Sequence, residues 1–591
     1  VDLDGEEHRT EEKDLVVLAW SGIGCPMARV YVPRLSGISD DYQGRVSFFQ
    51  IHSNLQDKVP DIREELNERP VSFPVVRDRD GELARTLGAE RTTDVIVLER
   101  GVVRYHGSVD DQYSFEERPG EARDTVRKAS ATTNYLRDAL DALLAGESPP
   151  VAVTPRFGCA LGLRSAASFV AKDFPGPTFH RDVEPLFQKH CQDCHREKGI
   201  GPFALTNYED AAGWAEMIAE VVADGSMPPW HADRTVGEFS NDRSLKDSES
   251  KTILDWVAAG APKGDPDDSP KPRSWEEGWT IGKPDAVFSL PEFEVPADGR
   301  VEYRYVTVET NFEEDRWVQA AEFSSTGGEV VHHVLSFVER KGSWLPWSTG
   351  SKRPWRPRFR VTDLLQGAPR SEWGKWGRRT AKYTKHLRIG NAGGMDGFFL
   401  GAAAGDIPIQ FPEGRAKLLP KGAKIVCQVH YTPNGKPTKT ITSLGLRFAK
   451  TPPPQAIESH AIATVALEIP PGESKVEVAA RHKFKRDGLL LSMAPHMHLR
   501  GRAFRFELEL PDGTKEEVLR VSNFDFDWQP AYVLAEPREI PKGSVLRATG
   551  IFDNSEANPH NPNPKEPVFF GLQSDEEMMI GYFEVVWDQK G

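Results

Sequence analysis

The chain carries the stretch Cys191-Gln192-Asp193-Cys194-His195, the most specific pattern in its sequence. Two thiols three positions apart, followed directly by an imidazole, form the pattern by which a haem is attached through its vinyl groups and ligated through its iron. A zinc knuckle or a disulfide is the alternative, but no second CxxC or CxxH pair lies nearby to complete a tetrahedral site. The stretch therefore predicts one covalent haem c and a redox protein.

Iron in such a site needs a sixth ligand, and a methionine follows in the same segment. Met227 lies in Gly225-Ser226-Met227-Pro228-Pro229-Trp230, where two prolines restrict the loop. A thioether ligand raises the reduction potential of the iron. We expect His195 and Met227 to be the axial ligands, with His231 as the competing candidate.

Length and composition limit the class of protein. The 591 residues exceed what one hydrophobic core serves, so several domains are expected. A net charge of -15 argues against nucleic-acid binding, and 38% hydrophobic with 28% charged residues is typical of a soluble globular protein. No apolar run approaches the roughly 20 residues of a transmembrane helix. Because the chain begins at Val1 rather than Met, and haem is attached covalently outside the bacterial cytoplasm, we expect a periplasmic or extracellular protein.

Residues 1–145 predict a small α/β domain. Apolar runs at 15–20, 46–51 and 94–98 are typical of strands, and the first is followed by a Gly-rich turn, Cys25-Pro26 and a helix. This arrangement resembles the thioredoxin-like redoxin fold, whose reactive thiol lies at the same strand-to-helix turn. A helix N-terminus at that position would lower the pKa of the Cys25 thiol.

Two departures from that family affect the interpretation of Cys25. Ala28 stands where a thioredoxin has its second Cys, and Thr93 stands at the position of the usual cis-proline. Redox catalysis by the Cys25 thiol is therefore one interpretation, and a structural disulfide with Cys159 is the favoured one. Cys427 is expected to be a buried thiol, because its spacing places it on the opposite face of a strand from a candidate histidine ligand.

The rest of the chain divides at Pro-rich breaks. Helical patterns around the CxxCH stretch resemble a class I cytochrome c, and the later sequence has short strands broken by Gly and Pro, as in β-sandwiches. We predict a multidomain protein with an α/β thioredoxin-like domain, an all-α cytochrome c domain and two all-β, jelly-roll-like sandwiches. The predicted boundaries are 1–145 for the redoxin domain, 146–176 for a linker, 177–262 for the cytochrome domain, 263–284 for a second linker, and 285–451 and 452–591 for the two sandwiches.

Histidines recur at three places in the β-rich part: His332-His333, His430 and His496-Met497-His498. Residues two apart share one face of a strand, so His496 and His498 can reach one metal, whereas the adjacent His332 and His333 need a bulge or a strand end to converge. Clustered imidazoles together with a thioether favour copper, because imidazole suits both of its oxidation states and methionine stabilises Cu(I).

These motifs occur in the order found in the type II copper, ascorbate-dependent monooxygenases, the family of peptidylglycine α-hydroxylating and dopamine β-monooxygenase. The resemblance covers about residues 285–588. It implies two copper ions, one for electron transfer and one for O2, in separate sandwiches across an open, water-filled cleft. The implied ligands are His332, His333 and His430 for the first ion and His496, His498 and Met578 for the second, with Met579 as the alternative methionine.

The resemblance also implies the chemistry, which is activation of O2, abstraction of hydrogen from a C–H bond and hydroxylation. The implied catalytic residues are His496, His498, Met578 and Tyr582, the last of which matches a substrate-contacting tyrosine of the family. Ascorbate is the usual reductant of that family, and the fused haem or another redox protein could replace it here. Ala494 stands where the peptide-amidating members have an arginine, which disfavours a glycine-extended peptide and leaves the organic substrate unknown.

A basic, aromatic segment lies between the first two histidine motifs. Residues 340–388 hold 14 Lys or Arg against 2 acidic residues, interleaved with five tryptophans. Such a segment could bind an acidic partner or a second copy of the chain, and a surface insertion with arginines packed on tryptophans is the alternative. Three interpretations of the whole chain remain: the monooxygenase, an electron-transfer or assembly protein that keeps the copper fold as a scaffold, and a thiol redox sensor built on Cys25.

Overall fold

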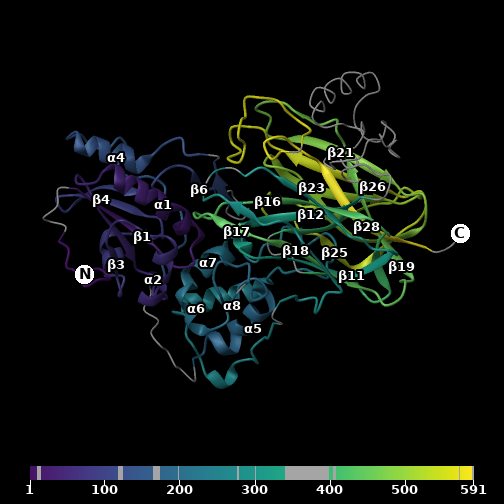
Figure 1. The fold of residues 1–591 in the computed structure, drawn as a ribbon, viewed down its shortest axis with the longest axis horizontal. Coiled ribbons are helices and arrows are strands. Elements are labelled where there is room, and N and C mark those ends of the chain that lie inside the picture. Colours follow the sequence, from purple (N-terminus) through teal and green to yellow (C-terminus); the bar gives the residue numbers. More distant parts are fainter. Residues whose placement is uncertain are drawn as a thin grey trace.

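The computed structural model describes the chain in three parts. Figure 1 shows an α/β domain at the N-terminal end, a group of helices beside it and a β-rich half that contains the C-terminus. Among the described residues, no helix is long and apolar enough to cross a membrane. The described residues are 1–591 except 10–14, 117–123, 129, 164–173, 198, 276–277, 298, 300, 340–397, 404–407, 572 and 589–591, so the predicted binding segment 340–388 lies outside them.

The N-terminal domain is built on a five-stranded sheet of order β3-β2-β1-β4-β5. Strands β1 to β3 are parallel, and β4 and β5 are antiparallel to their neighbours. This topology, with α1 directly after β1, confirms the predicted thioredoxin-like fold. The elements are β1 (Leu15–Ser21), α1 (Pro26–Asp41), β2 (Ser47–His52), α2 (Val59–Glu68), β3 (Val75–Arg77), α3 (Glu82–Leu87), β4 (Val95–Glu99), β5 (Val102–Gly107), the hairpin β6 (Tyr113–Glu116) and β7 (Asp124–Arg127), and α4 (Tyr135–Leu144).

The central position of β1 in this sheet explains why the sequence of β1 is strongly apolar. Every residue of β1 is buried, because alternate side chains enter two different hydrophobic cores on the two faces of the sheet. Helix α1 begins at Pro26, a residue favoured in the first turn, and buries Tyr31, Leu35 and Ile38 at helical spacing. The chain therefore presents Cys25 at the N-terminus of α1, where β1 has just ended.

The predicted linker 146–176 differs from the expectation over its first half. Val153 forms a β-bridge with His106, and Ala160 forms one with Arg91. This stretch therefore packs against the N-terminal domain. Its packing brings Cys159 back to the start of α1. The predicted second linker, 263–284, also packs on its neighbours, since the Arg273 guanidinium forms an ion pair with Asp193 at 2.6 Å.

Helices follow in the segment predicted as the cytochrome domain. They lie before and after the CxxCH stretch, as the helical patterns in the sequence predicted. The fully buried Trp256 packs with Phe179 and Phe187 in their common core. The identification with a cytochrome c stays a prediction. The elements are the π-helix η1 (Phe179–Val183), α5 (Glu184–His190), α6 (Tyr208–Gly213), α7 (Ala215–Ala223), α8 (Asp247–Ala258) and the 3-10 turn η2 (Pro266–Asp268).

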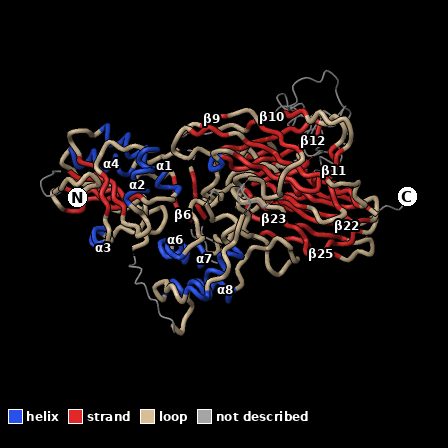
Figure 2. The backbone as a smooth tube through the Cα atoms, turned by 60° about the horizontal axis from the view of Figure 1, so that its bottom comes forward, coloured by secondary structure: helices blue, strands red, loops and turns tan. Residues whose placement is uncertain are grey.

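The β-rich half contains two four-stranded sheets, β10-β16-β12-β13 and β21-β26-β23-β24, and one larger sheet of order β25-β22-β28-β19-β15-β11-β18-β8. Figure 2 shows these strands filling this part of the molecule. The strands before the predicted boundary are β8 (Ala286–Ser289), β9 (Phe293–Val295), β10 (Arg304–Glu309), β11 (Arg316–Ser325), β12 (Val331–Glu339), β13 (Phe398–Ala403), β14 (Ile409–Gln410), β15 (Arg415–Leu419), β16 (Lys424–Tyr431), β17 (Thr438–Thr440) and β18 (Thr442–Phe448), with the 3-10 turn η3 (Gly328–Val330).

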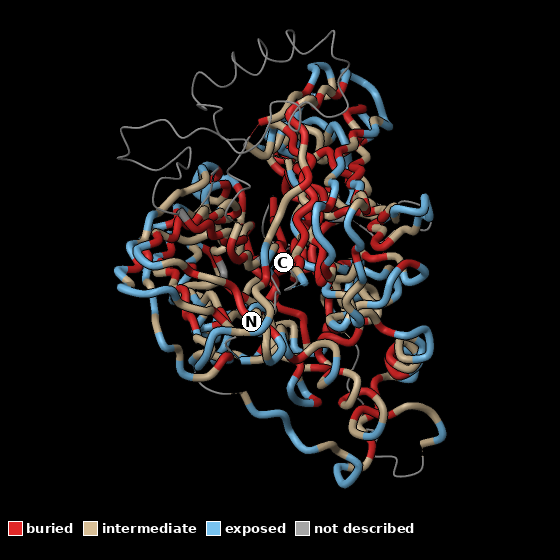
Figure 3. The backbone as a smooth tube through the Cα atoms, turned by 90° about the vertical axis from the view of Figure 1, so that its right-hand side faces the viewer, coloured by how far each residue is buried: buried red, intermediate tan, exposed pale blue. Residues whose placement is uncertain are grey.

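The larger sheet passes through the predicted boundary between the sandwiches. Strand β19 pairs with β15 on one side and with β28 on the other. Two separate hydrophobic cores nevertheless lie beneath the two four-stranded sheets. Figure 3 shows buried segments in the interior of the molecule and exposed segments mainly in its outer loops. The later strands are β19 (Gln455–Ala463), β20 (Glu468–Ile469), β21 (Val476–Lys483), β22 (Gly488–His496), β23 (Gly501–Glu509), β24 (Lys515–Val521), β25 (Tyr532–Ile540), β26 (Val545–Phe552), β27 (Val568–Phe569) and β28 (Ile580–Trp587).

Candidate metal centre

Three histidines converge at the start of β12. The pairing of β12 with β16 shifts register between Val331 and His333, which is the irregularity that two adjacent histidines need to face one point. His333 lies opposite His430 of β16. Ligand nitrogens of His332, His333 and His430 all lie within 4.8 Å of one another. The structure thus brings together the three residues predicted for the first copper ion.

The ring nitrogens of this group are arranged for a metal. Nδ1 of His332 lies 3.0 Å from Nδ1 of His333, and Nε2 of His332 hydrogen-bonds the Asp527 carboxylate at 3.0 Å. A carboxylate on the outer nitrogen of a histidine fixes the tautomer that leaves the inner nitrogen for a metal. Burial, together with the charges of His332 and His430, lowers the pKa of His333 well below its usual value, so this imidazole is neutral, as a ligand must be.

The second group lies at the end of β22. His496 is the last residue of the strand, and His498 follows in the turn instead of on the same strand face, which differs from the expectation. Their rings still lie 5.3 Å apart. Nδ1 of His496 bonds the Gln529 side chain at 2.8 Å, and Nδ1 of His498 bonds the Glu576 carbonyl at 3.1 Å. Burial lowers the pKa of His496 to about 4 and that of His498 to about 3, so both rings are neutral.

The structure distinguishes the two candidate methionines. Met579 is fully buried in the core of the second sandwich, beside Met497. Met578 points to the other side and packs in a small cluster with Ile580 and Tyr582. The Tyr582 ring lies 6.5 Å from the His496 ring. Met578 is therefore the methionine on the histidine side, as the sequence favoured.

One cavity of about 110 Å³ connects the two groups of histidines. His332 and His333 line it from β12, and His496 and Tyr582 line it from β22 and β28. Residues of both groups therefore line the same cavity. The Tyr582 side chain is only 8% exposed, and its hydroxyl has no hydrogen-bond partner among the described residues. Burial raises the pKa of Tyr582, so the hydroxyl stays protonated and can donate.

A buried carboxylate that the sequence analysis missed organises the second group. Glu577 is fully buried and accepts hydrogen bonds from the backbone N–H groups of His498, Arg500 and Met578, at 2.9, 2.6 and 3.2 Å. The guanidinium of Arg500 is buried too and bonds Asn554 and the Asp575 carbonyl. Glu577 thus ties together the two chain segments that carry His498 and Met578. An acidic residue next to a candidate ligand was its only sequence signal.

Asp527 and Gln529 provide a matched test of the two groups. We expect Asp527→Ala to lower copper affinity at the three-histidine group by about tenfold, the lower end of the range for such supporting residues because this carboxylate is largely exposed. Gln529→Ala should weaken only the second group. Copper competition titrations with a chelator would measure both affinities. Equal losses at both groups in either variant would contradict this assignment.

The haem attachment stretch follows helix α5. Nδ1 of His195 donates a hydrogen bond to the Phe203 carbonyl at 3.1 Å, so the proton lies on Nδ1 and Nε2 is left for a metal. Burial lowers the pKa of His195, so the ring is neutral. Met227 lies after α7, is 39% exposed, and donates its backbone N–H to Val221. These features fit a histidine-ligated haem, and they leave the sixth ligand a prediction.

Removing one thiol tests this assignment. We expect Cys194→Ala, expressed with a haem-attachment system, to lose the double covalent link, because only Cys191 remains to bond a vinyl group. Cys427→Ala is the matched control, since that thiol is buried in the sandwich core. The absorption spectrum of the pyridine complex of the denatured protein, which differs between one and two vinyl groups bonded to cysteine, would show the difference. If the wild-type chain has the mass of the polypeptide without haem, the prediction is contradicted.

The N-terminal domain brings two thiols together. The sulfurs of Cys25 and Cys159 lie 2.7 Å apart, and the Thr92 hydroxyl lies 2.9 Å from the Cys25 sulfur. Burial opposes ionisation of Cys25, but the bonds from Cys159 and Thr92 lower its pKa to about 6. The bond to Cys25, together with burial, raises the pKa of Cys159.

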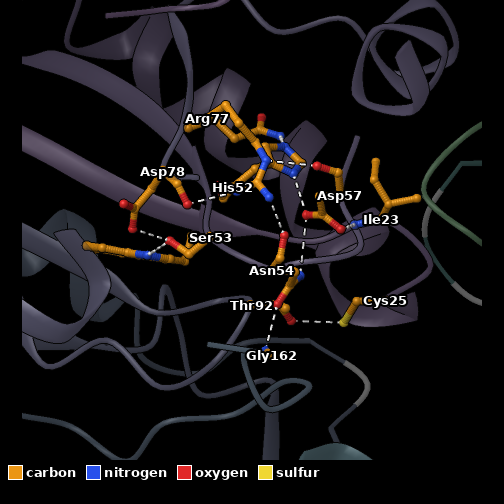
Figure 4. A network of polar contacts seen from close by, with 12 residues as sticks. Ile23, Cys25, His52, Ser53, Asn54, Asp57, Arg77, Asp78, Thr92 and Gly162 are labelled. Carbon is orange, nitrogen blue, oxygen red and sulfur yellow. Dashed lines mark hydrogen bonds and ion pairs between the residues drawn. The ribbon is translucent and has the colours of Figure 1, made fainter. Parts of the chain in front are cut away.

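A network of polar residues lies next to this thiol pair. Figure 4 shows His52, Asp57 and Asn54 near Thr92 and Cys25. Nδ1 of His52 lies 2.9 Å from the Asp57 carboxylate, and the Gly162 N–H donates to the Asn54 side chain at 3.0 Å. The sequence analysis assigned His52 no role, and the structure shows it as a buried partner of Asp57. The thiols themselves lie beneath the helical segment, in one cluster with Trp214. A Cβ at Gly24, whose φ is +81°, would lie 3.2 Å from the Trp214 ring, so the glycine permits this close approach.

Comparisons with known proteins cover only part of the chain. No protein-family model matches, and no curated protein matches. Hypothetical protein SMc02350 from Sinorhizobium meliloti 1021 is 25% identical, with a TM-score of 0.21, over 26% of this chain and 80% of that chain. A putative thiol:disulfide interchange protein DsbE from Chlorobium tepidum is 19% identical, with a TM-score of 0.16, over 17% and 70%.

A third solved structure also matches only part of this chain. A secreted Mycobacterium tuberculosis disulfide oxidoreductase is 15% identical, with a TM-score of 0.15, over 22% of this chain and 81% of that chain. Each match covers about as much of this chain as one domain. The thioredoxin-like fold of the N-terminal domain rests on its own strand order.

Proposed function

We propose that the β-rich half binds two copper ions and uses them to hydroxylate a C–H bond of an organic substrate with O2. One observation supports the proposal: five histidines lie in two groups, and His332, His333 and His496 of these groups line the same cavity. The first group is His332, His333 and His430, and the second is His496, His498 and Met578. Nitrogen ligands suit both oxidation states of copper, and a thioether favours Cu(I) in the second group.

The residues around the cavity have separable roles in this function. The bound copper would supply O2 activation and one-electron transfer. Asp527 and Gln529 hold one ring from each group in a fixed orientation. Tyr582 offers a substrate in the cavity a protonated hydroxyl that has no hydrogen-bond partner in the described part of the chain, and the adjacent Phe398 ring, 4.7 Å away, gives an apolar wall. The cavity thus fits a small molecule with a mainly apolar surface.

Electrons would come from the haem segment or from an ascorbate-like reductant, and the protein would work outside the cytoplasm. The test is reconstitution of the full chain with copper, followed by O2 consumption with ascorbate in the presence of a screen of small substrates. Two bound copper ions and substrate-dependent, hydroxylated product would support the proposal. Two bound ions without product from any substrate would favour the assembly or scaffold interpretation, and fewer than two ions would overturn the proposal.

A specific observation favours a second, thiol-based function for the N-terminal domain. The adjacent sulfurs of Cys25 and Cys159 are placed to form one disulfide, with release of two protons and two electrons to an external thiol oxidant. Because both thiols are buried beneath the helical segment, we propose a structural disulfide rather than exchange with protein partners. Alkylation and intact-mass analysis before and after reduction would show two additional labelled thiols only after reduction. Two thiols that label without reduction would contradict this.

A further inference from the structure

We propose that Phe526 is the electron-transfer bridge between the two histidine groups, an inference that rests on the proposed copper function. Its ring stacks on His332, with centroids 6.3 Å apart and planes at 22°. The same ring meets His498 edge-on, with centroids 6.2 Å apart and planes at 88°. One aromatic side chain therefore touches a ligand of each group, and it lines the cavity between them.

The loop that carries Phe526 is anchored to both groups. It connects β24 to β25, and the residues beyond the ring bind the two sites: Asp527 bonds His332, and Gln529 bonds His496. The loop is also closed on itself, because the Gln529 side chain donates to the Phe526 carbonyl at 2.7 Å and the Asp527 N–H donates to the Asp525 carboxylate at 2.8 Å. These bonds hold the ring in place between the histidines.

The same loop contacts the segment that follows Met227. The His231 ring lies 4.0 Å from the Asp525 carboxylate, and Trp230 packs edge-on against Tyr532 at 5.0 Å. The Asn241 side chain donates to the Ala531 carbonyl at 2.7 Å. An electron that arrives through the helical segment would therefore enter the β-rich half next to Phe526.

The proposed step moves one electron and changes no bond. Copper bound by the three-histidine group would give up one electron, copper bound by His496, His498 and Met578 would accept it, and the ring of Phe526 would be neither oxidised nor protonated. The ring occupies space between the two groups and lies against a histidine of each, which shortens the path that an electron must cross outside the protein. The electron would come from a one-electron reductant, either a haem at His195 or added ascorbate.

The test compares three variants of the copper-loaded full chain. In Phe526→Leu the ring is lost and the volume is largely kept, Phe526→Tyr keeps the ring, and Trp528→Leu removes a ring of the same loop that contacts none of these histidines among the described residues. A pulse of reductant would be followed by freeze-quench EPR, which reports Cu(II) in each group. Bound copper and the resting EPR spectrum should be unchanged in all three.

We expect electron redistribution between the groups to slow by about tenfold or more in Phe526→Leu, which corresponds to about 1.4 kcal/mol of activation free energy. Phe526→Tyr and Trp528→Leu should keep the wild-type rate. An unchanged rate in Phe526→Leu, with wild-type turnover intact, would overturn the bridge alone. Two bound coppers and fast redistribution without turnover in the wild type would support the bridge and overturn the proposed hydroxylation instead.

Discussion

His496→Ala is expected to bind one copper ion per chain instead of two and to lose O2-dependent hydroxylation altogether. The second group has two neutral imidazoles and one thioether, and a copper ion held by His498 and Met578 alone lacks the nitrogen ligands that give the site its affinity. The three-histidine group lies on two other strands, β12 and β16, and keeps all of its ligands. Its copper should therefore remain and stay reducible.

Elemental analysis and Cu(II) EPR of the reconstituted variant would measure this. His460→Ala is the matched control, because His460 lies in the same half on β19 and interacts with Glu458 instead of either group. The control should keep both copper ions and full turnover. Two ions in His496→Ala, or loss of both, would contradict the division into two independent ligand groups.

Glu577→Ala is expected to lower the free energy of unfolding by about 3 kcal/mol or more, because each buried donor left without an acceptor costs about 1–3 kcal/mol. The substitution leaves the N–H groups of His498, Arg500 and Met578 without their acceptor. It also removes a negative charge that acts on the buried Arg500 guanidinium. The loss should appear as a lower denaturation midpoint and as weaker copper binding at the second group.

Chemical denaturation of the metal-free chain would separate the effect on folding from the effect on metal binding. Glu577→Gln should lose less stability, because the amide oxygen still accepts one or two of these bonds. Glu536→Ala, at an exposed position on β25, should change the stability by less than about 0.5 kcal/mol. If Glu577→Ala is as stable as Glu536→Ala, Glu577 does not hold together the segments that carry His498 and Met578.

The sequence by itself predicted those features that depend only on neighbouring residues. The CxxCH stretch, the histidine pairs and the need for a bulge at His332-His333 are properties of neighbouring residues, and alternation along a strand already predicts that Cys427 is buried. The strand-helix alternation likewise predicted the thioredoxin-like sheet, because period and turn residues act over short distances.

Only the tertiary structure decided how these pieces meet. Packing of segments that lie more than a hundred residues apart brings Cys159 to Cys25 and His332 to Asp527, and no local pattern encodes such pairs. Met578 is distinguished from Met579 only by the cluster that each side chain enters, with Tyr582 on one side of the strand or in the core on the other. Glu577 and Phe526 have no motif at all. Their roles arise from burial and from contacts between distant segments, which depend on the packing of the whole β-rich half.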